Sequence, residues 1–370
     1  LWGWAMFWVM HSGIIAAIGM VFASYLAFFL PLDDLAQRLS AVAAIFVLSA
    51  VNYVGVKQGS VLQTAFTVGK VFVIVVMVAA GFALGGDGGS VATTAAGATA
   101  GATAATTATG LLGGGTPSDF LLALVAGLFA FGGWHMVTYQ AGETVDARRT
   151  VPRALGWGVA IVTVCYVLLN AVYFYVLPVE TVVSSSRIAA DAADAVMGFG
   201  GAAAMSGLVV FSTFGALAGI VLAGPRVYWA MAEDGLLFRW AGILHPRYAT
   251  PHRAILLQAV WASFLVMTGT YRALFTRVIY TEWIFFGLMA VGLVMLRRRP
   301  GLERDYSVPL YPVLPILFAA ASFGIVIHQV WVDPVESATG LGIVLLGLPV
   351  FALWRRRRGS PSPTSHPPTP

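Results

Sequence analysis

The feature that most constrains this sequence is an apolar stretch from 120 to 143 with two adjacent glycines near its middle. A membrane-spanning helix needs roughly 20 residues, so the stretch is long enough to cross a bilayer. Gly132 and Gly133 each lower helix propensity by about 1 kcal/mol, which predicts a break at this point. A break within lipid exposes backbone N–H and C=O groups, and such breaks line water-filled cavities or substrate sites. The alternative is a continuous helix that uses the glycines for close packing.

Composition places the whole chain in a membrane. Hydrophobic residues make up 59% of it and charged residues only 10%, whereas about a quarter of a soluble domain is charged. We expect an all-α polytopic membrane protein with about ten transmembrane helices, since each apolar segment approaches the length of a tilted span. The segments are 4–30, 39–56, 61–84, 120–142, 154–177, 203–231, 254–270, 278–296, 311–331 and 338–354.

The basic residues predict the orientation of these helices. The net charge of +5 comes from short clusters at the ends of apolar segments, a pattern typical of membrane topology, so we expect no nucleic acid partner. If the loops after the second, fourth, sixth and eighth segments and the tail face the cytoplasm, 16 of the 21 basic residues lie on that side. Four lie on the other side: Arg38, Arg187, Arg272 and Arg277. The positive-inside rule therefore predicts a multi-pass protein of the plasma (inner) membrane with a cytoplasmic C-terminus.

The segments between and beyond the helices differ from them in composition. Residues 85–119 are nearly all Gly, Ala, Thr and Ser, which predicts a flexible extracellular loop. Residues 355–370 should form a disordered cytoplasmic tail. The chain opens without Met and inside an apolar segment, so we expect an N-terminal part to be missing. One cysteine and six scattered histidines indicate no metal site, and no cofactor is expected.

Lys70 is the remaining basic residue, and it lies within the third apolar segment. A lysine near the bilayer centre costs a few kcal/mol, so it should face the protein interior and a polar partner. Such a lysine can exchange a proton near neutral pH. A lysine that snorkels to the interface is the alternative. Ser212 and Thr213 in the sixth segment are candidate partners, although hydroxyls in helices usually bond back to their own backbone.

Residues around and after the predicted break form a second group of candidates. Glu143 ends the fourth segment, and Arg153 follows Pro152 at the start of the next. They constitute either a structural ion-pair cluster at the cytoplasmic mouth or an inner gate. Phe129 and Trp134 flank the break, where we expect them to form pocket walls. No nucleotide-binding, metalloprotease or serine-hydrolase motif occurs, and we expect no enzyme.

Several motifs resemble the amino acid-polyamine-organocation permeases, and within them the L-type-like amino acid transporters and their bacterial relatives. The matching motifs are Gly127–Trp134 with Gly142-Glu143 and Arg149–Ala154, Asn52–Lys57 to Gln63–Lys70, Phe214–Gly219 with Pro225-Arg226 and Ala230–Gly235, and Arg297–Pro300 to Tyr311–Pro315. They span nearly the whole chain.

The resemblance implies a leucine-transporter-like fold of two inverted five-helix repeats, with the first two helices absent. Residues 1–84 would then complete the first repeat, and residues 120–296 would form the second. A cytoplasmic linker, 297–310, would lead to the last two helices in 311–354. In the family the first helix is broken and holds the substrate carboxylate, so half of the binding site would be missing.

The resemblance also implies a substrate site at the break. Phe129 resembles the aromatic gate above the substrate. The carbonyls of Ala130 and Phe131 would face the substrate ammonium, and Trp134 would shape the side-chain pocket. The implied substrate-binding set is Phe129, Ala130, Phe131, Gly132, Gly133 and Trp134.

These observations predict a secondary amino acid transporter that works by alternating access, either proton-coupled or as an exchanger. Lys70 resembles the lysine that stands where sodium-driven relatives bind an ion, with Ser212 and Thr213 nearby. The partners would be the amino acid, the lipid bilayer and a proton as candidate coupling ion. We expect no acidic residue at pocket depth, which favours small neutral amino acids. The alternative is a non-transporting membrane scaffold or a subunit that needs a partner chain.

Overall fold

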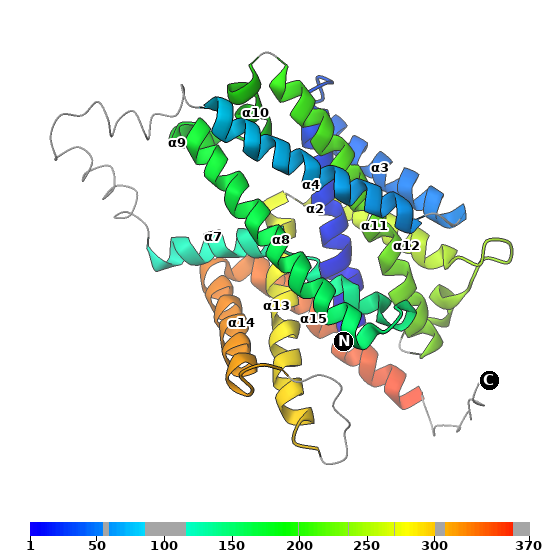
Figure 1. Ribbon diagram of the computed structural model, residues 1–370. Helices are drawn as coiled ribbons and strands as arrows, with labels where there is room; N and C mark the ends of the chain where they lie inside the picture. Colours follow the sequence, from blue (N-terminus) through cyan, green and yellow to red (C-terminus); the bar gives the residue numbers. More distant parts are fainter. Residues whose placement is uncertain are drawn as a thin grey trace.

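A computed structural model describes residues 1–54, 59–85, 116–198, 200–235, 237–269, 271–299 and 308–357. Every regular element within these ranges is a helix, as the composition predicted (Figure 1). Most of the predicted extracellular loop, part of the linker and most of the tail lie outside the described residues.

Eight helical spans are long and apolar enough to cross a membrane, and two shorter apolar helices accompany them. Each of the ten predicted segments overlaps one of these helices. The long spans are α1 (Trp2–Ala5) with η1 (Met6–Met10) and α2 (His11–Leu26), then α3 (Asp34–Val54), α4 (Gly59–Leu84), α7 (Pro117–Ala130) with the start of η3 (Trp134–Glu143), α8 (Ala147–Val176), α11 (Gly201–Glu233), α13 (Tyr271–Leu296) and α14 (Val313–Val332). The shorter ones are α12 (His252–Thr268) and a part of α15 (Pro334–Arg357). The remaining short helices are α9 (Val179–Ser184), α10 (Ile188–Met197) and η4 (Arg239–Gly242).

Two helices extend beyond their predicted ends. The helix α15 continues to Arg357, three residues into the predicted tail. The helix α7 begins at Pro117, inside the predicted loop, because Thr116 and Asp119 form a capping box. Thr116 Oγ1 accepts from the Asp119 backbone N–H at 3.2 Å, and Asp119 Oδ2 accepts from the Thr116 backbone N–H at 2.8 Å. Proline at the first helical position strengthens this start, because an N–H there has no intrahelical partner.

The helix α2 (dark blue in Figure 1) lies at the centre of the bundle, in contact with α3, α11, α12 and α13. Small residues on its surface permit this close packing. A Cβ at Gly13 would lie 2.6 Å from a methyl group of Val278, and one at Gly19 would lie 3.6 Å from Cβ of Ala41. The main cluster of buried apolar side chains joins the same five helices. This cluster therefore fixes α13 against the four other helices.

A proline inside α11 is compensated by a side chain from α12. Pro225 has no N–H, so the carbonyl four residues earlier, that of Val221, loses its intrahelical donor. Gln258, which is 1% exposed, donates from Nε2 to this carbonyl at 3.2 Å. His11 of α2 places Nε2 2.9 Å from the neighbouring carbonyl of Ile220. Side chains from α12 and α2 thus contact backbone carbonyls of α11 where the proline interrupts its intrahelical hydrogen bonds.

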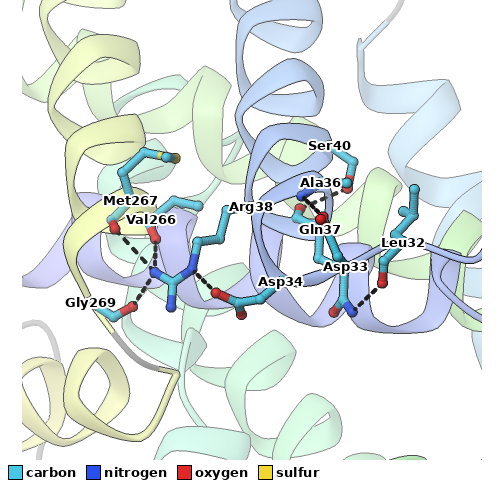
Figure 2. A network of polar contacts seen from close by, with 10 residues as sticks. All are labelled: Leu32, Asp33, Asp34, Ala36, Gln37, Arg38, Ser40, Val266, Met267 and Gly269. Carbon is cyan, nitrogen blue, oxygen red and sulfur yellow. Dashed lines mark hydrogen bonds and ion pairs between the residues drawn. The ribbon is translucent and has the colours of Figure 1, made fainter.

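Arg38 ties the start of α3 to the end of α12 (Figure 2). Its Nη1 donates to the carbonyls of Val266, Met267 and Gly269 at 2.8, 3.2 and 3.0 Å. Its Nε donates to Oδ2 of Asp34 at 2.9 Å. The last carbonyls of a helix have no intrahelical partner and carry partial negative charge, so a guanidinium stabilises this end.

Candidate functional site

The break predicted at the paired glycines is confirmed. The helix α7 ends at Ala130, a turn follows from Phe131 to Gly133, and the chain resumes at Trp134 as the 3-10 helix η3. Gly133 has a φ of +94°, which residues with a side chain rarely adopt. A Cβ at Gly132 would approach a preceding backbone carbonyl oxygen to 3.0 Å. Both glycines therefore permit the backbone conformation of the break, and the alternative of a continuous helix is wrong.

Hydrogen bonds satisfy part of the backbone around the break. The Gly132 N–H donates to the Phe129 carbonyl at 3.0 Å. The carbonyl of Ala130, predicted to face a substrate ammonium, accepts from the Tyr166 hydroxyl of α8 at 2.9 Å. A carbonyl oxygen has two lone pairs, so this bond leaves one of them for a further donor. The sequence offered no signal for this contact, because it joins residues of different helices.

A cavity of about 210 Å³ lies beside the break. Three predicted site residues line it, namely Phe131, Gly132 and Trp134. The other lining residues are Leu128, Val159, Glu282, Trp283, Phe286 and Phe318. They belong to α7, α8, α13 and α14, so the break and these helices line one cavity.

Phe129, the predicted gate, is not among the lining residues. It is half-buried and packs against the central cluster around α2 and against Val125 and Ile279. Trp134 is 38% exposed, and its ring centroid lies 5.2 Å from that of Phe286. The two aromatic residues that flank the break therefore have different surroundings, one in the core and one on the cavity wall.

Glu282 overturns the expectation that no acidic residue lies at pocket depth. It is 4% exposed, lines the cavity and belongs to the middle of α13. His135, at the start of η3, places Nε2 3.9 Å from Oε1 of Glu282. The sequence signal was present, because Glu282 is the single charged residue of the segment 278–296. The helix α13 begins at Tyr271, seven residues before the predicted start, so Glu282 lies further from the end of its helix than the predicted segment implied.

Lys70 lies in α4, away from the cavity lining. It is half-buried, one turn after Phe66, whose ring centroid lies 4.5 Å from that of Phe211 in α11. This contact places the lysine's region of α4 beside the part of α11 that carries Ser212 and Thr213. Within the described residues no hydrogen bond or ion pair joins Lys70 to either hydroxyl, and Thr213 Oγ1 donates to the carbonyl four residues earlier at 2.7 Å.

The predicted gate pair is only partly described. Glu143 ends η3, but its side chain lies outside the described residues. Arg153 is exposed near the start of α8 and makes no ion pair with another described side chain.

Known proteins that resemble this chain are amino acid transporters. The Serine/threonine exchanger SteT of Bacillus subtilis is 30% identical over 365 residues, which cover 97% of this chain and 79% of the exchanger. The Asc-type amino acid transporter 1 of Mus musculus is 27% identical over 366 residues, which cover 96% of this chain and 66% of that protein. The Large neutral amino acids transporter small subunit 2 of Mus musculus is 30% identical over 234 residues, which cover 63% of this chain and 43% of that protein.

The chain thus spans about two thirds of the length of the Asc-type transporter and a larger part of the bacterial exchanger. Residues 1–353 match the family model described as amino acid permease, and this range includes the broken helix, the cavity residues and Lys70. The chain belongs to the amino acid permease family, within the amino acid-polyamine-organocation superfamily.

Proposed function

We propose that this protein is a secondary amino acid transporter that works by alternating access, with its substrate bound beside the break between α7 and η3. The observation that carries the proposal is the broken span itself, because peptide groups exposed at membrane depth suit the charged ends of an amino acid. The adjoining cavity of about 210 Å³ offers space for a small solute. Rocking of the helices around this site would expose it to each side of the membrane in turn.

Exchange is the favoured mode of transport, with proton coupling as the second. The bacterial relative is by name a serine/threonine exchanger, and it aligns with 97% of this chain. Lys70 is the proposed coupling residue, since its positive charge can replace a bound cation. Ser212 and Thr213 are its proposed neighbours during transport. Glu143 and Arg153 are proposed as parts of an inner gate.

The bias of basic residues supports a plasma-membrane protein with its C-terminus in the cytoplasm. Residues 1–84 and 120–296 are proposed to belong to the two inverted repeats. The single-cysteine variants Ser184→Cys and Arg247→Cys, made after Cys165 is replaced by alanine, test the orientation by labelling intact cells with an impermeant thiol reagent. Labelling at 184 and protection at 247 are expected, and the reverse pattern contradicts the orientation.

Uptake by the reconstituted protein tests the proposed function. Proteoliposomes loaded with unlabelled amino acid should accumulate labelled amino acid, and empty vesicles should accumulate far less if exchange is obligatory. An imposed pH gradient should drive uptake into empty vesicles if a proton is the coupling ion. Absence of uptake under both conditions, from protein that elutes as a single folded species, would contradict the proposal.

A subunit that depends on a partner chain is the second candidate. One mouse relative is by name a small subunit of a transporter, and it aligns with 63% of this chain. Blue-native electrophoresis of membranes that express the protein separates the two candidates. A stable complex with another protein, together with no amino acid binding by the purified chain, would favour the subunit.

A further inference from the structure

The cavity beside the break combines aromatic walls with one carboxylate. Four aromatic residues of the lining, Trp134, Trp283, Phe286 and Phe318, come from three different elements. Their rings are in mutual contact, with centroids 5.2 Å apart for Trp134 and Phe286, 6.0 Å for Trp283 and Phe286, and 5.7 Å for Trp283 and Phe318. Phe131 adds a fifth aromatic ring to the lining. Aromatic faces carry partial negative charge and attract cations, and cages of such rings recognise ammonium groups.

Glu282 is the one acidic residue among the described residues of this lining. A carboxylate held at membrane depth is costly unless a proton, a cation or hydrogen-bond donors compensate its charge. His135 is an ionisable neighbour, and the 3.9 Å separation is longer than a hydrogen bond. No lysine or arginine belongs to the part of the lining that the structure describes. The described cavity therefore combines a carboxyl group with aromatic faces, and a histidine is the basic side chain beside that carboxyl group.

We propose that this cavity is a subsite for the cationic side chain of a substrate, in which the Glu282 carboxylate binds an ammonium that the aromatic rings surround. The inference rests on the proposed function, because it places the substrate backbone at the break and its side chain in the cavity. It names the substrate class as amino acids whose side chain ends in a primary amine. It replaces the sequence-based expectation of small neutral substrates, which depended on the absence of an acidic residue at this depth.

Binding of L-lysine and L-norleucine to the purified protein in nanodiscs tests the inference. The two amino acids share the backbone and the aliphatic chain, and they differ in the terminal ammonium. Wild-type protein should bind lysine more tightly than norleucine. Glu282→Gln should weaken lysine binding by at least about 30-fold, the effect of removing one partner of a buried charge pair, and should leave norleucine binding nearly unchanged.

Several results would overturn the inference. These are equal affinity of the wild-type protein for the two amino acids, binding of neither, or a lysine preference that survives Glu282→Gln. If a folded Glu282→Gln variant loses the same affinity for lysine as for norleucine, the carboxylate binds the α-ammonium that both substrates share and not the side-chain ammonium. The exposed Glu180 of α9 provides the matched control, because Glu180→Gln removes the same charge outside the cavity and should alter neither affinity.

Two further measurements keep the test decisive. If Glu282→Gln does not fold, Glu282→Asp can be used, because it retains the carboxylate on a shorter side chain. This variant should weaken the binding of lysine more than the binding of norleucine. Phe318→Leu removes one aromatic wall and should also reduce the preference for lysine. Lysine binding that depends on Glu282 without any transport would refute the proposed function and leave the subsite standing, whereas transport without that dependence would refute the subsite alone.

Discussion

Replacement of Gly133 by alanine tests whether the break is required for substrate binding. Gly133 adopts a φ of +94°, and alanine in a left-handed conformation costs roughly 1–2 kcal/mol. A Cβ at this position meets no atom within 4 Å, so backbone strain is the expected effect and steric overlap is absent. The strain disfavours the turn relative to a continuous helix, for which alanine is the best residue.

The expected result is a loss of affinity together with a modest loss of stability. A shift of roughly 1–2 kcal/mol away from the binding-competent turn should weaken the apparent affinity for substrate by roughly 5–30-fold. The midpoint of thermal unfolding should fall by about 2–6 °C. Titration with labelled amino acid measures the first quantity, and size-exclusion chromatography after heating measures the second.

Gly127→Ala provides the matched control on the same helix. Gly127 lies inside α7 and a Cβ there also meets no atom within 4 Å, so alanine should stabilise the helix by about 1 kcal/mol and leave affinity unchanged. Identical behaviour of the two variants in both assays would refute the reasoning, because it would mean that the turn at Gly133 has no role of its own.

Three other substitutions test the remaining parts of the structure. Lys70→Ala should reduce uptake at least about tenfold while binding of substrate is retained, if Lys70 couples conformational change to the ion; normal uptake would remove it from the mechanism. Arg38→Ala should lower stability by about 1.5–3 kcal/mol, because it removes charged hydrogen bonds from the end of α12, and an unchanged unfolding midpoint would contradict that role. Gln258→Leu should cost about 1–3 kcal/mol by leaving the Val221 carbonyl without its donor. The loss of stability caused by Gln258→Leu should be smaller in a protein that also carries Pro225→Ala, because alanine restores the backbone N–H. An equal loss of stability with proline and with alanine at position 225 would contradict the explanation.

The sequence predicted the elements that depend on local chemistry. Apolar segments of spanning length identified the ten apolar helices, and the paired glycines identified the break, because both signals follow from residues close together in the chain. The start of α7 at Pro117 was readable as well, since Thr116 and Asp119 form a capping box. Composition had instead assigned these residues to the neighbouring loop.

The contacts between distant helices could not be predicted. The Tyr166 hydroxyl meets the Ala130 carbonyl only because α8 packs beside the break. Phe129 packs against the core, although its position next to the glycines suggested a pocket wall. Glu282 could have been found from sequence as a single carboxylate in an apolar span, but its depth depended on where α13 begins. The depth of a side chain depends on where its helix begins, and its direction depends on packing.

Protection of a cysteine beside the break tests the central claim most directly. Val159 of α8 lines the cavity, and Val164 of the same helix is exposed outside it. After Cys165 is replaced by alanine, Val159→Cys and Val164→Cys each give the protein one thiol that can be labelled. Saturating amino acid substrate should slow the labelling of Val159→Cys several-fold and leave that of Val164→Cys unchanged. Equal labelling of Val159→Cys with and without bound substrate would contradict a substrate site at the broken helix.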